Sequence, residues 1–403
     1  MREDRAYDVV LFGATGFTGG LTAEYLARHA PDGLRWALAG RNPAKLAAVR
    51  DRLVDIDPTL AELPLLTADV TDAESLRRVA EAARVVATTV GPYVHHGEPL
   101  VAACARAGTD YLDLTGEPEF VDTMYVRHHA EAVRTGARLV HACGFDSIPH
   151  DLGVWFTIKH LPADVPITVD GYVRAGGKFS AGTYHSALTA FSRTAQASRA
   201  GRERRAVEPR PQGRRVRAVP GKVGRSGELG GWAVPLPTID PQVVRRSAAA
   251  RPEYGPDFRY RHFAAVKRLP TIVVGAAGLG GLMGLVKVPP ARRWLLGRLA
   301  SGQGPTPQQR AKSWFRVTFV GTGGDRRVFT EVSGGDPGYD ETAKMLAESA
   351  LCLALDDGLP ATSGQVTPVT AMGDALLGRL QRAGLTFRVL KEQRARSAVD
   401  AAA

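Results

Sequence analysis

Three glycines, Gly13, Gly16 and Gly19, stand in the sequence GATGFTG, directly after an apolar run and directly before helix-forming residues. In a strand–turn–helix unit the first glycine permits a tight turn, the second lets the backbone approach a pyrophosphate, and the third lets the helix pack against the strand. The free N–H groups at the helix start then face the phosphates. The spacing predicts a dinucleotide site made of Gly13, Ala14, Thr15, Gly16, Phe17, Thr18 and Gly19.

The end of the second predicted strand indicates which dinucleotide this site takes. An NAD site needs a carboxylate there for the ribose 2′-hydroxyl, but the sequence from Arg35 to Lys45 contains no acid. It offers Arg41, Asn42 and Lys45 instead, and a guanidinium suits a 2′-phosphate. We therefore predict NADP. Asp69, after the third strand, is expected either to receive the adenine amino group or to cap the next helix.

Polar residues also follow the fourth, fifth and sixth predicted strands, where a doubly wound sheet places its ligand crevice. The Gly91-Pro92 turn and Tyr93 are predicted to lie beside the nicotinamide ribose. We expect further side chains to converge on this rim: Asp113, Glu117, Cys143, Asp146 and Ser147. Cys143 is interpreted as a buried structural thiol rather than a nucleophile. The adjacent His95 and His96 project differently, so we expect surface or cofactor-edge histidines and no metal site.

The catalytic mechanism is narrowed by motifs that the sequence lacks. None of the ten tyrosines has a lysine four residues later, which excludes the Tyr-x-x-x-Lys mechanism of short-chain reductases. The sequence also contains neither HExxH nor GxSxG. Tyr184 and His185, at the start of a predicted helix, are the candidates for a proton donor, with helix packing as the alternative.

The elements that would position these residues alternate between strand and helix over residues 1–150. Short apolar runs at 7–12, 35–40, 63–70, 84–90, 109–114 and 137–143 predict strands, and helical patterns separate them. This alternation predicts a doubly wound parallel sheet. Farther along, 314–334 predicts a β-hairpin, and 341–355 and 368–384 predict helices.

The net charge of +11 is concentrated in one stretch. Residues 193–225 hold eleven Lys and Arg against two Glu, and no aromatic residue. We predict a solvated basic loop, with a phosphate-rich partner or an anionic membrane surface as alternatives. Nucleic acid is not expected, because aromatic stacking platforms are missing. The three widely spaced cysteines and the charged N-terminus indicate a cytoplasmic protein.

The segment 270–287 is mostly apolar and is flanked by basic residues. It is shorter than the roughly 20 residues that a membrane-spanning helix needs. Three interpretations remain: a buried or homodimer-interface segment, a hydrophobic lid or membrane-surface patch that admits an acyl chain, and a transmembrane helix. The second would place the protein peripherally on the inner face of the plasma membrane.

Several blocks together carry a family resemblance: GATGFTG, GRNPAKL, VGPYVHHGEPLVAACARAGTDYLDLTGE, CGFDSIPHDLG and GQVTPVTAMGDALLGRLQRAGLTFRV. They resemble the saccharopine dehydrogenase-like oxidoreductases, and within them the trans-acting enoyl reductase subfamily of actinobacteria. The resemblance implies a Rossmann domain at 1–150, a second α+β domain at 151–335, and C-terminal helices at 336–395 that return to the first domain. It also implies that the residues from Gly13 to Gly19 and Arg41 hold the nucleotide. The subfamily usually has Gly-Gly-Thr where this chain has Ala181-Gly182-Thr183.

The expected function is therefore an NADP-dependent reductase. The resemblance implies reduction of a carbon–carbon double bond in a lipid- or polyketide-type acyl substrate, delivered by a carrier protein. Two alternatives stay open: a saccharopine dehydrogenase-type reductase of an imine or amino-acid substrate, and a non-catalytic NADP-binding, lipid-associated protein.

Overall fold

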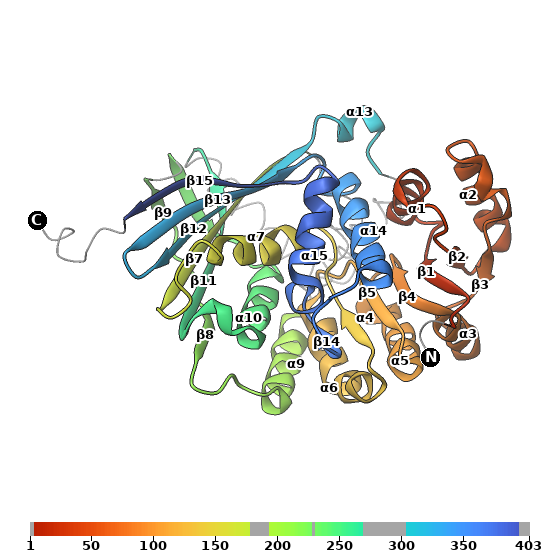
Figure 1. Cartoon of the computed structure of the whole chain (residues 1–403), viewed down its shortest axis with the longest axis horizontal. Coiled ribbons are helices and arrows are strands. Elements are labelled where there is room, and N and C mark those ends of the chain that lie inside the picture. The colour runs from red at the N-terminus through yellow and green to blue at the C-terminus, as the bar shows by residue number, and fades with distance from the viewer. Residues whose placement is uncertain (1–3, 178–192, 228–229, 269–303, 395–403) are drawn as a thin grey trace, which may run out of the picture.

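The computed structural model describes residues 4–177, 193–227, 230–268 and 304–394. Tyr184, His185 and the apolar segment 270–287 lie outside these residues, so the predictions for them stay predictions. The chain forms two β-sheets with helices between and around them (Figure 1). Within the described residues, no helix is long and apolar enough to cross a membrane.

The N-terminal sheet alternates strands with helices, as the sequence predicts. Its elements are β1 (Tyr7–Phe12), α1 (Phe17–His29), β2 (Trp36–Gly40), α2 (Pro43–Val54), η1 (Pro58–Glu62), β3 (Leu65–Thr67), α3 (Ala73–Ala82), β4 (Ala83–Thr88), α4 (Tyr93–His96), α5 (Glu98–Ala107), β5 (Asp110–Asp113), α6 (Pro118–Thr135) and β6 (Arg138–Val140). The strand order is β14-β6-β5-β4-β1-β2-β3, and the paired strands are parallel. The doubly wound prediction is confirmed, and the order reverses between β1 and β4, where such sheets bind ligands.

The outermost strand of this sheet comes from the C-terminal part of the chain. β14 (Gly364–Val366) pairs with β6 in parallel, in the register Gln365 to Leu139. Three residues are too few for a period-two pattern, so the sequence did not predict this strand. β14 ties the C-terminal region to the N-terminal sheet.

The second sheet is mixed. It contains β7 (Ile167–Gly176), β8 (Arg215–Ala218), β9 (Gly224–Ser226), β10 (Gly231–Pro235), β11 (Asp257–Val266), β12 (Trp314–Gly323), β13 (Arg326–Gly334) and β15 (Thr386–Arg394). The order is β15-β13-β12-β7-β11-β10-β9, with β8 paired to β11. β12 and β13 form the predicted antiparallel hairpin. The prediction that the whole of 336–395 packs as helices on the first domain is wrong for 386–394, because these residues extend the second sheet as β15.

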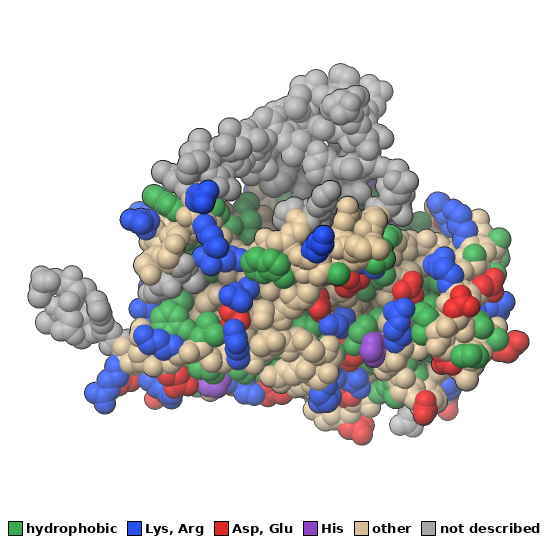
Figure 2. All heavy atoms as spheres, turned by 90° about the horizontal axis from the view of Figure 1, so that it is seen from above, with side chains coloured by type: hydrophobic (Ala, Val, Ile, Leu, Met, Phe, Trp, Pro, Cys, Tyr) green, Lys and Arg blue, Asp and Glu red, His purple; other side chains and the backbone are tan. Residues whose placement is uncertain are grey.

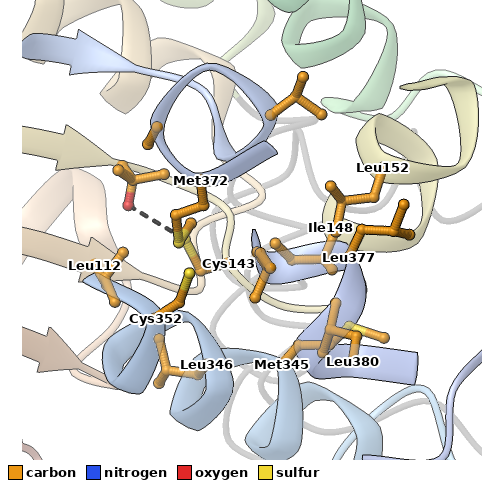
Figure 3. Packing of buried hydrophobic residues seen from close by; sticks show 14 of the residues in the cluster. Leu112, Cys143, Ile148, Leu152, Met345, Leu346, Cys352, Met372, Leu377 and Leu380 are labelled. Atoms are coloured by element: carbon orange, nitrogen blue, oxygen red, sulfur yellow. Dashed lines mark hydrogen bonds between the residues drawn. The ribbon is translucent and has the colours of Figure 1, made fainter. Parts of the chain in front are cut away.

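Helices α14 (Asp340–Leu355) and α15 (Pro368–Arg382) stand between the two sheets (Figure 1). α14 packs on α1, β1 and β4, and α15 packs on α14 and on α7 (Ile148–Ile158). Cys143, Cys352 and Met372 meet in the apolar core that these helices share with the first sheet (Figure 3). This shared core joins the two sheets.

The basic stretch 193–225 is not the loop that its charge and its glycine and proline content predict. Its first part is α9 (Thr194–Val207), which packs on α6, and β8 and β9 follow it. Arg204 of α9 is only 2% exposed, and its Nε lies 2.5 Å from Asp122 Oδ1 on α6. A partner on another helix therefore compensates the buried charge, and a single-sequence pattern cannot reveal such a partner.

The described residues of the second half of the chain also include α10 (Asp240–Ala250), η2 (Pro252–Tyr254) and α13 (Pro307–Arg310). α10 packs on α7 and β11. On the face shown in Figure 2, Lys and Arg side chains are interspersed with Asp and Glu side chains rather than gathered in one stripe.

Candidate active site

A cleft of about 1660 Å³ runs from the glycine loop to the second sheet. Its wall includes residues that follow β1, β2, β4 and β5 of the first sheet, together with residues of β7, β11 and β12 of the second. The cleft therefore begins at the point where the strand order of the first sheet reverses, and it ends against another sheet. One end is suited to a dinucleotide, and the described residues at the other end line a space for a second molecule.

The glycine loop has the backbone that the sequence predicts for phosphate binding. Gly13 has φ +93°, in the left-handed region, and a Cβ there would meet Val90 at 2.6 Å. A Cβ on Gly19 would overlap the carbonyl oxygen of Gly13, so this glycine allows α1 to pack on the loop. A Cβ on Gly16 would meet Gly13 O only at 3.4 Å, an ordinary contact. The space beside Gly16 is therefore left for a ligand rather than for protein packing.

The start of α1 is arranged for an anion. Its N-cap residue is Gly16, and no side chain caps the first turn. Gly13, Thr15, Gly16, Phe17, Thr18 and Gly19 line the cleft, whereas Ala14 is buried in the core. Uncapped N–H groups at a helix start bind phosphate well.

The end of β2 offers cations to the same part of the cleft. Arg41 and Lys45 line the wall, whereas Asn42 caps α2 by accepting a hydrogen bond from Lys45 N at 3.0 Å. Asp69 also lines the cleft and accepts hydrogen bonds from the backbone and hydroxyl of Thr71. These bonds lower the pKa of Asp69, and Arg41 contributes to the shift. Asp72, not Asp69, caps α3.

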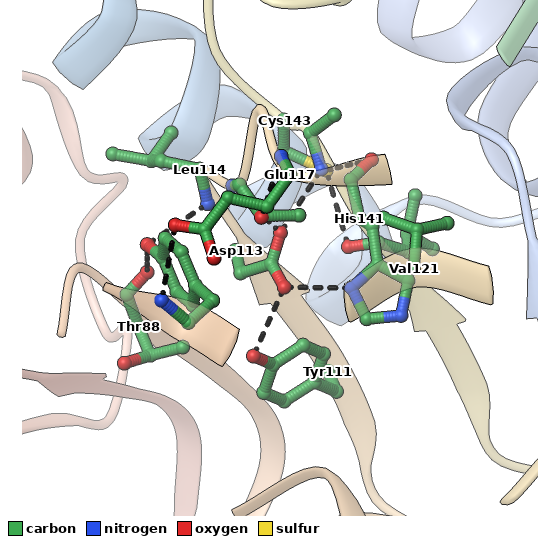
Figure 4. Close-up of polar contacts among 12 residues, drawn as sticks. Thr88, Tyr111, Asp113, Leu114, Glu117, Val121, His141 and Cys143 are labelled. Carbon is green, nitrogen blue, oxygen red and sulfur yellow. Dashed lines mark hydrogen bonds and ion pairs between the residues drawn. The ribbon is translucent and has the colours of Figure 1, made fainter. Parts of the chain in front are cut away.

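Gly91, Pro92 and Tyr93 line the cleft beyond the end of β4. The hydroxyl of Tyr93 donates to Thr88 O at 3.1 Å and accepts from Leu114 N at 3.1 Å (Figure 4). Burial and the nearby Asp113 hold its pKa well above the ordinary value. The hydroxyl of Tyr93 therefore ties the ends of β4 and β5 together and is no source of protons.

Only part of the predicted rim reaches the cleft. Glu117 and Asp146 line it, but Asp113, Cys143 and Ser147 are buried and do not. Asp113 instead binds His141 Nδ1 at 2.6 Å and the Tyr111 hydroxyl at 3.0 Å, which holds β5 against β6 (Figure 4).

The thiol of Cys143 is also part of the protein interior. Burial, followed by the charge of Asp113, raises its pKa well above the ordinary value. The interpretation of Cys143 as a buried thiol is confirmed. His95 and His96 are exposed, and only His96 lines the cleft.

A cluster of buried ionisable side chains stands at the end of the cleft nearest the second sheet. Asp240, the first residue of α10, places Oδ1 2.9 Å from Nδ1 of His150 on α7. Its Oδ2 accepts a hydrogen bond from the Thr238 hydroxyl and lies 3.5 Å from Nε2 of His262 on β11. Nδ1 of His262 is in turn 2.8 Å from the Tyr260 hydroxyl. Asp146, immediately before the N-cap residue of α7, completes the cluster.

The ionisable side chains of this cluster have shifted pKa values. Burial works against the charged form of Asp240, but His150 and then His262 outweigh it and lower the pKa of Asp240 below its usual range. Burial opposes the charge of His150 as well, and Asp240 overcomes this and raises its pKa. Burial lowers the pKa of His262 to about 4. These shifts favour an Asp240–His150 ion pair beside a neutral His262.

The same three residues have a metal-like donor set. Single ligand atoms of His150, Asp240 and His262 all lie within 4.8 Å of one another. In the described residues, however, the oxygens of Asp240 already face Thr238 and His150. We therefore interpret the three side chains as an ionic and hydrogen-bonded row.

Sequence reasoning found Asp146 but missed His150, Asp240 and His262. His150 lies in the stretch CGFDSIPHDLG that follows the sixth strand, so its place near a strand end could have marked it. Asp240 and His262 are 90 and 112 residues farther on and follow no strand of the first sheet. Only the packing of α10 and β11 on α7 brings them to the site.

The wall of the cleft that the second sheet provides is largely apolar. Its apolar side chains are Val173, Ala175, Leu236, Ala264, Ala265 and Trp314. Arg193 stands at the cleft too, but its guanidinium is held by both carboxylate oxygens of Glu119 at 2.6 and 2.7 Å. This part of the cleft suits a ligand with a hydrocarbon portion.

Comparison with known proteins agrees with this geometry. Residues 9–140 match the model of the saccharopine dehydrogenase NADP-binding domain. A relative from Mycobacterium tuberculosis, provisionally named a trans-acting enoyl reductase, is 41% identical and covers 96% of this chain and 98% of its own length. A Mycobacterium ulcerans protein named trans-acting enoyl reductase is 36% identical, with 94% and 97% covered. The solved structure of saccharopine dehydrogenase (L-Glu forming) from Saccharomyces cerevisiae shares the fold, with TM-score 0.53, 15% identity, and 96% and 99% covered.

Proposed function

The chain belongs to the trans-acting enoyl reductase family of saccharopine dehydrogenase-like proteins and is an NADP-dependent oxidoreductase, and from this premise we propose that it reduces a carbon–carbon double bond of an acyl thioester. The observation that carries the proposal is one continuous cleft whose dinucleotide end meets a largely apolar wall. NADPH, when bound, supplies a hydride. The chain binds both reactants, orients them and provides the proton.

For the dinucleotide we propose the residues that the sequence singled out. The glycine loop and the start of α1 would hold the pyrophosphate, and Arg41 with Lys45 would hold the 2′-phosphate. Asn42, which caps α2, would contribute by fixing the start of that helix. Asp69 and the Gly91–Tyr93 turn would contact the adenine and the nicotinamide ribose.

For the second reactant we propose an acyl group delivered as a thioester by a carrier protein. An acyl chain would lie against Val173, Ala264 and Trp314, which line the wall without offering a charge. Trp314 is 45% exposed, so a hydrocarbon chain that covers it would remove apolar surface from water.

A comparison of substrates tests this function. NADPH oxidation is measured with enoyl thioesters of increasing chain length and, separately, with an α-keto acid plus lysine. We expect turnover only with the enoyl thioesters, and a kcat/KM that rises by up to about fourfold per added methylene, the equivalent of about 0.8 kcal/mol. Trp314→Ala should reduce this chain-length gain and leave the shortest substrate unaffected. Turnover with the keto acid and lysine alone would refute the proposal.

A further inference from the structure

Five acidic side chains line the described wall of the cleft: Asp69, Glu117, Glu119, Asp146 and Asp240. Four of them are already engaged by other residues. Asp69 binds Thr71, Glu119 binds Arg193, and Asp240 binds Thr238 and His150. Glu117 accepts hydrogen bonds from the backbone N–H groups of Tyr93 and Val94 at 3.2 and 2.8 Å.

Asp146 differs from these four. No hydrogen bond joins its carboxyl to another described residue, and its side chain is partly open to the cleft. Its Oδ2 lies 3.2 Å from the position that a Cβ on Gly116 would take, which places it over the end of β5. The Gly91–Tyr93 turn and the apolar wall of the second sheet line the same cleft.

Charged groups face Asp146 from more than one element. His150 faces it from α7 and Asp240 from α10, with His262 on β11 behind them, and Glu117 follows Gly116 after β5. Burial raises the pKa of Asp146, the negative charge of Asp240 raises it further, and His150 offsets part of the effect, which leaves a pKa of about 7. The pKa values of these two carboxyls are thus shifted in opposite directions, with Asp240 ionised and Asp146 able to hold a proton. Such a separation assigns the roles of acid and of fixed charge.

We propose that Asp146 is the proton donor of the reduction, and that Asp240 and His150 are positioning residues behind it. This inference rests on the proposed function, because the proton is needed only when a double bond accepts a hydride. The proton-donor candidates from the sequence, Tyr184 and His185, lie outside the described residues, so their role stays a prediction.

The step balances without any further reactant. The β-carbon of the enoyl thioester receives the hydride and forms a new C–H bond, and the carbon–carbon π bond breaks. The electron pair of the π bond takes the proton from the Asp146 carboxyl at the α-carbon. Asp146 is left as a carboxylate and recovers a proton from water in the open cleft. The thioester is reduced and NADPH is oxidised by the same two electrons.

The main test replaces Asp146 in the full-length protein. Asp146→Asn keeps the shape and removes the transferable proton, and Asp146→Glu keeps the proton at a shifted position. Asp164→Asn, an exposed site before β7, is the matched control. NADPH affinity, measured by fluorescence, should be the same in all four proteins. Turnover of an enoyl thioester should fall by about 100-fold or more in Asp146→Asn, in part in Asp146→Glu, and not in the control.

A second readout does not depend on turnover. Infrared difference spectra of wild type minus Asp146→Asn should contain the carbonyl band of a protonated carboxyl at pH 6, and this band should disappear by pH 9. The wild-type kcat should fall over the same pH range, because the donor must carry its proton. This measurement needs no bound NADPH, so it also applies if Asp146→Asn binds NADPH poorly.

The outcomes separate the inference from the proposed function. Enoyl turnover by wild type with turnover of Asp146→Asn within threefold of it, or the absence of the protonated band at pH 6, overturns the role of Asp146 alone. If wild type reduces only imine substrates, the proposed function fails. The donor role then survives only if Asp146→Asn lowers that turnover and the infrared band is present.

Discussion

Asp240 Oδ1 lies 2.9 Å from His150 Nδ1, and both side chains are 1% exposed. The two residues belong to the first turns of α10 and α7, so a single ion pair holds two helix starts together at the cleft. A carboxylate in the first turn of a helix is also favoured by the helix dipole. Asp146 stands four residues before His150 and interacts electrostatically with both members of the pair.

The first prediction concerns the stability of that pair. His150→Ala and Asp240→Ala should each lower the free energy of unfolding by about 3–5 kcal/mol, because each leaves an uncompensated buried charge. The double variant should lose less free energy of unfolding than the sum of the two single losses. The difference should be about 1 kcal/mol or more, as is typical of residues in contact. Urea unfolding of the four proteins measures this coupling. Strictly additive costs would show that the two side chains do not interact.

The second prediction concerns cofactor choice. Arg41→Asp should raise the dissociation constant for NADPH by about 10- to 100-fold, which corresponds to about 1.5–3 kcal/mol for a hydrogen bond to a charged group. The affinity for NADH should stay the same or improve, since the new carboxylate can accept the 2′-hydroxyl. Arg28→Asp, an exposed charge reversal on α1, is the control. Equal NADPH affinities for Arg41→Asp and wild type would remove Arg41 from the site.

The third prediction separates folding from binding in the glycine loop. Gly16→Ala should leave the melting temperature unchanged and weaken NADPH binding, because its Cβ meets only ordinary contacts in the protein. Gly19→Ala should lower both, because its Cβ overlaps the Gly13 carbonyl. Gly20→Ala, with no atom closer than 3.7 Å, should change neither. If Gly16→Ala binds NADPH normally, the pyrophosphate does not approach this loop.

The fourth prediction concerns pH and stability. Asp151 is fully buried and accepts a hydrogen bond from Val369 N at 3.0 Å, and burial raises its pKa from 3.8 to about 6. The folded protein therefore holds this proton more tightly than the unfolded chain. Its contribution to stability is complete below pH 3.8 and is lost as the pH rises through 6, by about 3 kcal/mol for a shift of two units.

Urea unfolding between pH 4 and 8 tests this linkage. Asp151→Asn should show a smaller fall in the free energy of unfolding over this range than wild type, and Asp164→Asn should behave as wild type does. A fall of the same size in Asp151→Asn would mean that Asp151 is ionised in the folded protein.

Much of the first sheet follows from local sequence alone. The strands from β1 to β6 are short apolar runs between helical patterns, and the glycine loop can be recognised because its spacing is local. β14 and β15 are different. β14 has only three residues, and β15 gains its partner β13 from a hairpin more than fifty residues earlier.

The residues of the site also divide into those that local sequence predicts and those that depend on distant partners. Arg41 and Gly91 could be predicted because they follow strands whose order is set by a general rule. The pair Asp240 and His150 could not, because its members are 90 residues apart and Asp240 follows no strand of the first sheet. Arg204 illustrates the same limit, since its charge predicts exposure, and its ion pairs with Asp122 on α6 and with Glu208 explain its burial.

The destination of the hydride tests most directly whether the protein reduces the carbon–carbon double bond of an enoyl thioester. The protein is incubated with an enoyl thioester and with NADPH that carries deuterium at both C4 positions, in ordinary water, and the saturated product is analysed by mass spectrometry and NMR. We expect one deuterium per product molecule, at the β-carbon, with an unlabelled hydrogen at the α-carbon. Deuterium at a carbonyl-derived carbon, or unconsumed NADPH without any saturated product, would contradict it.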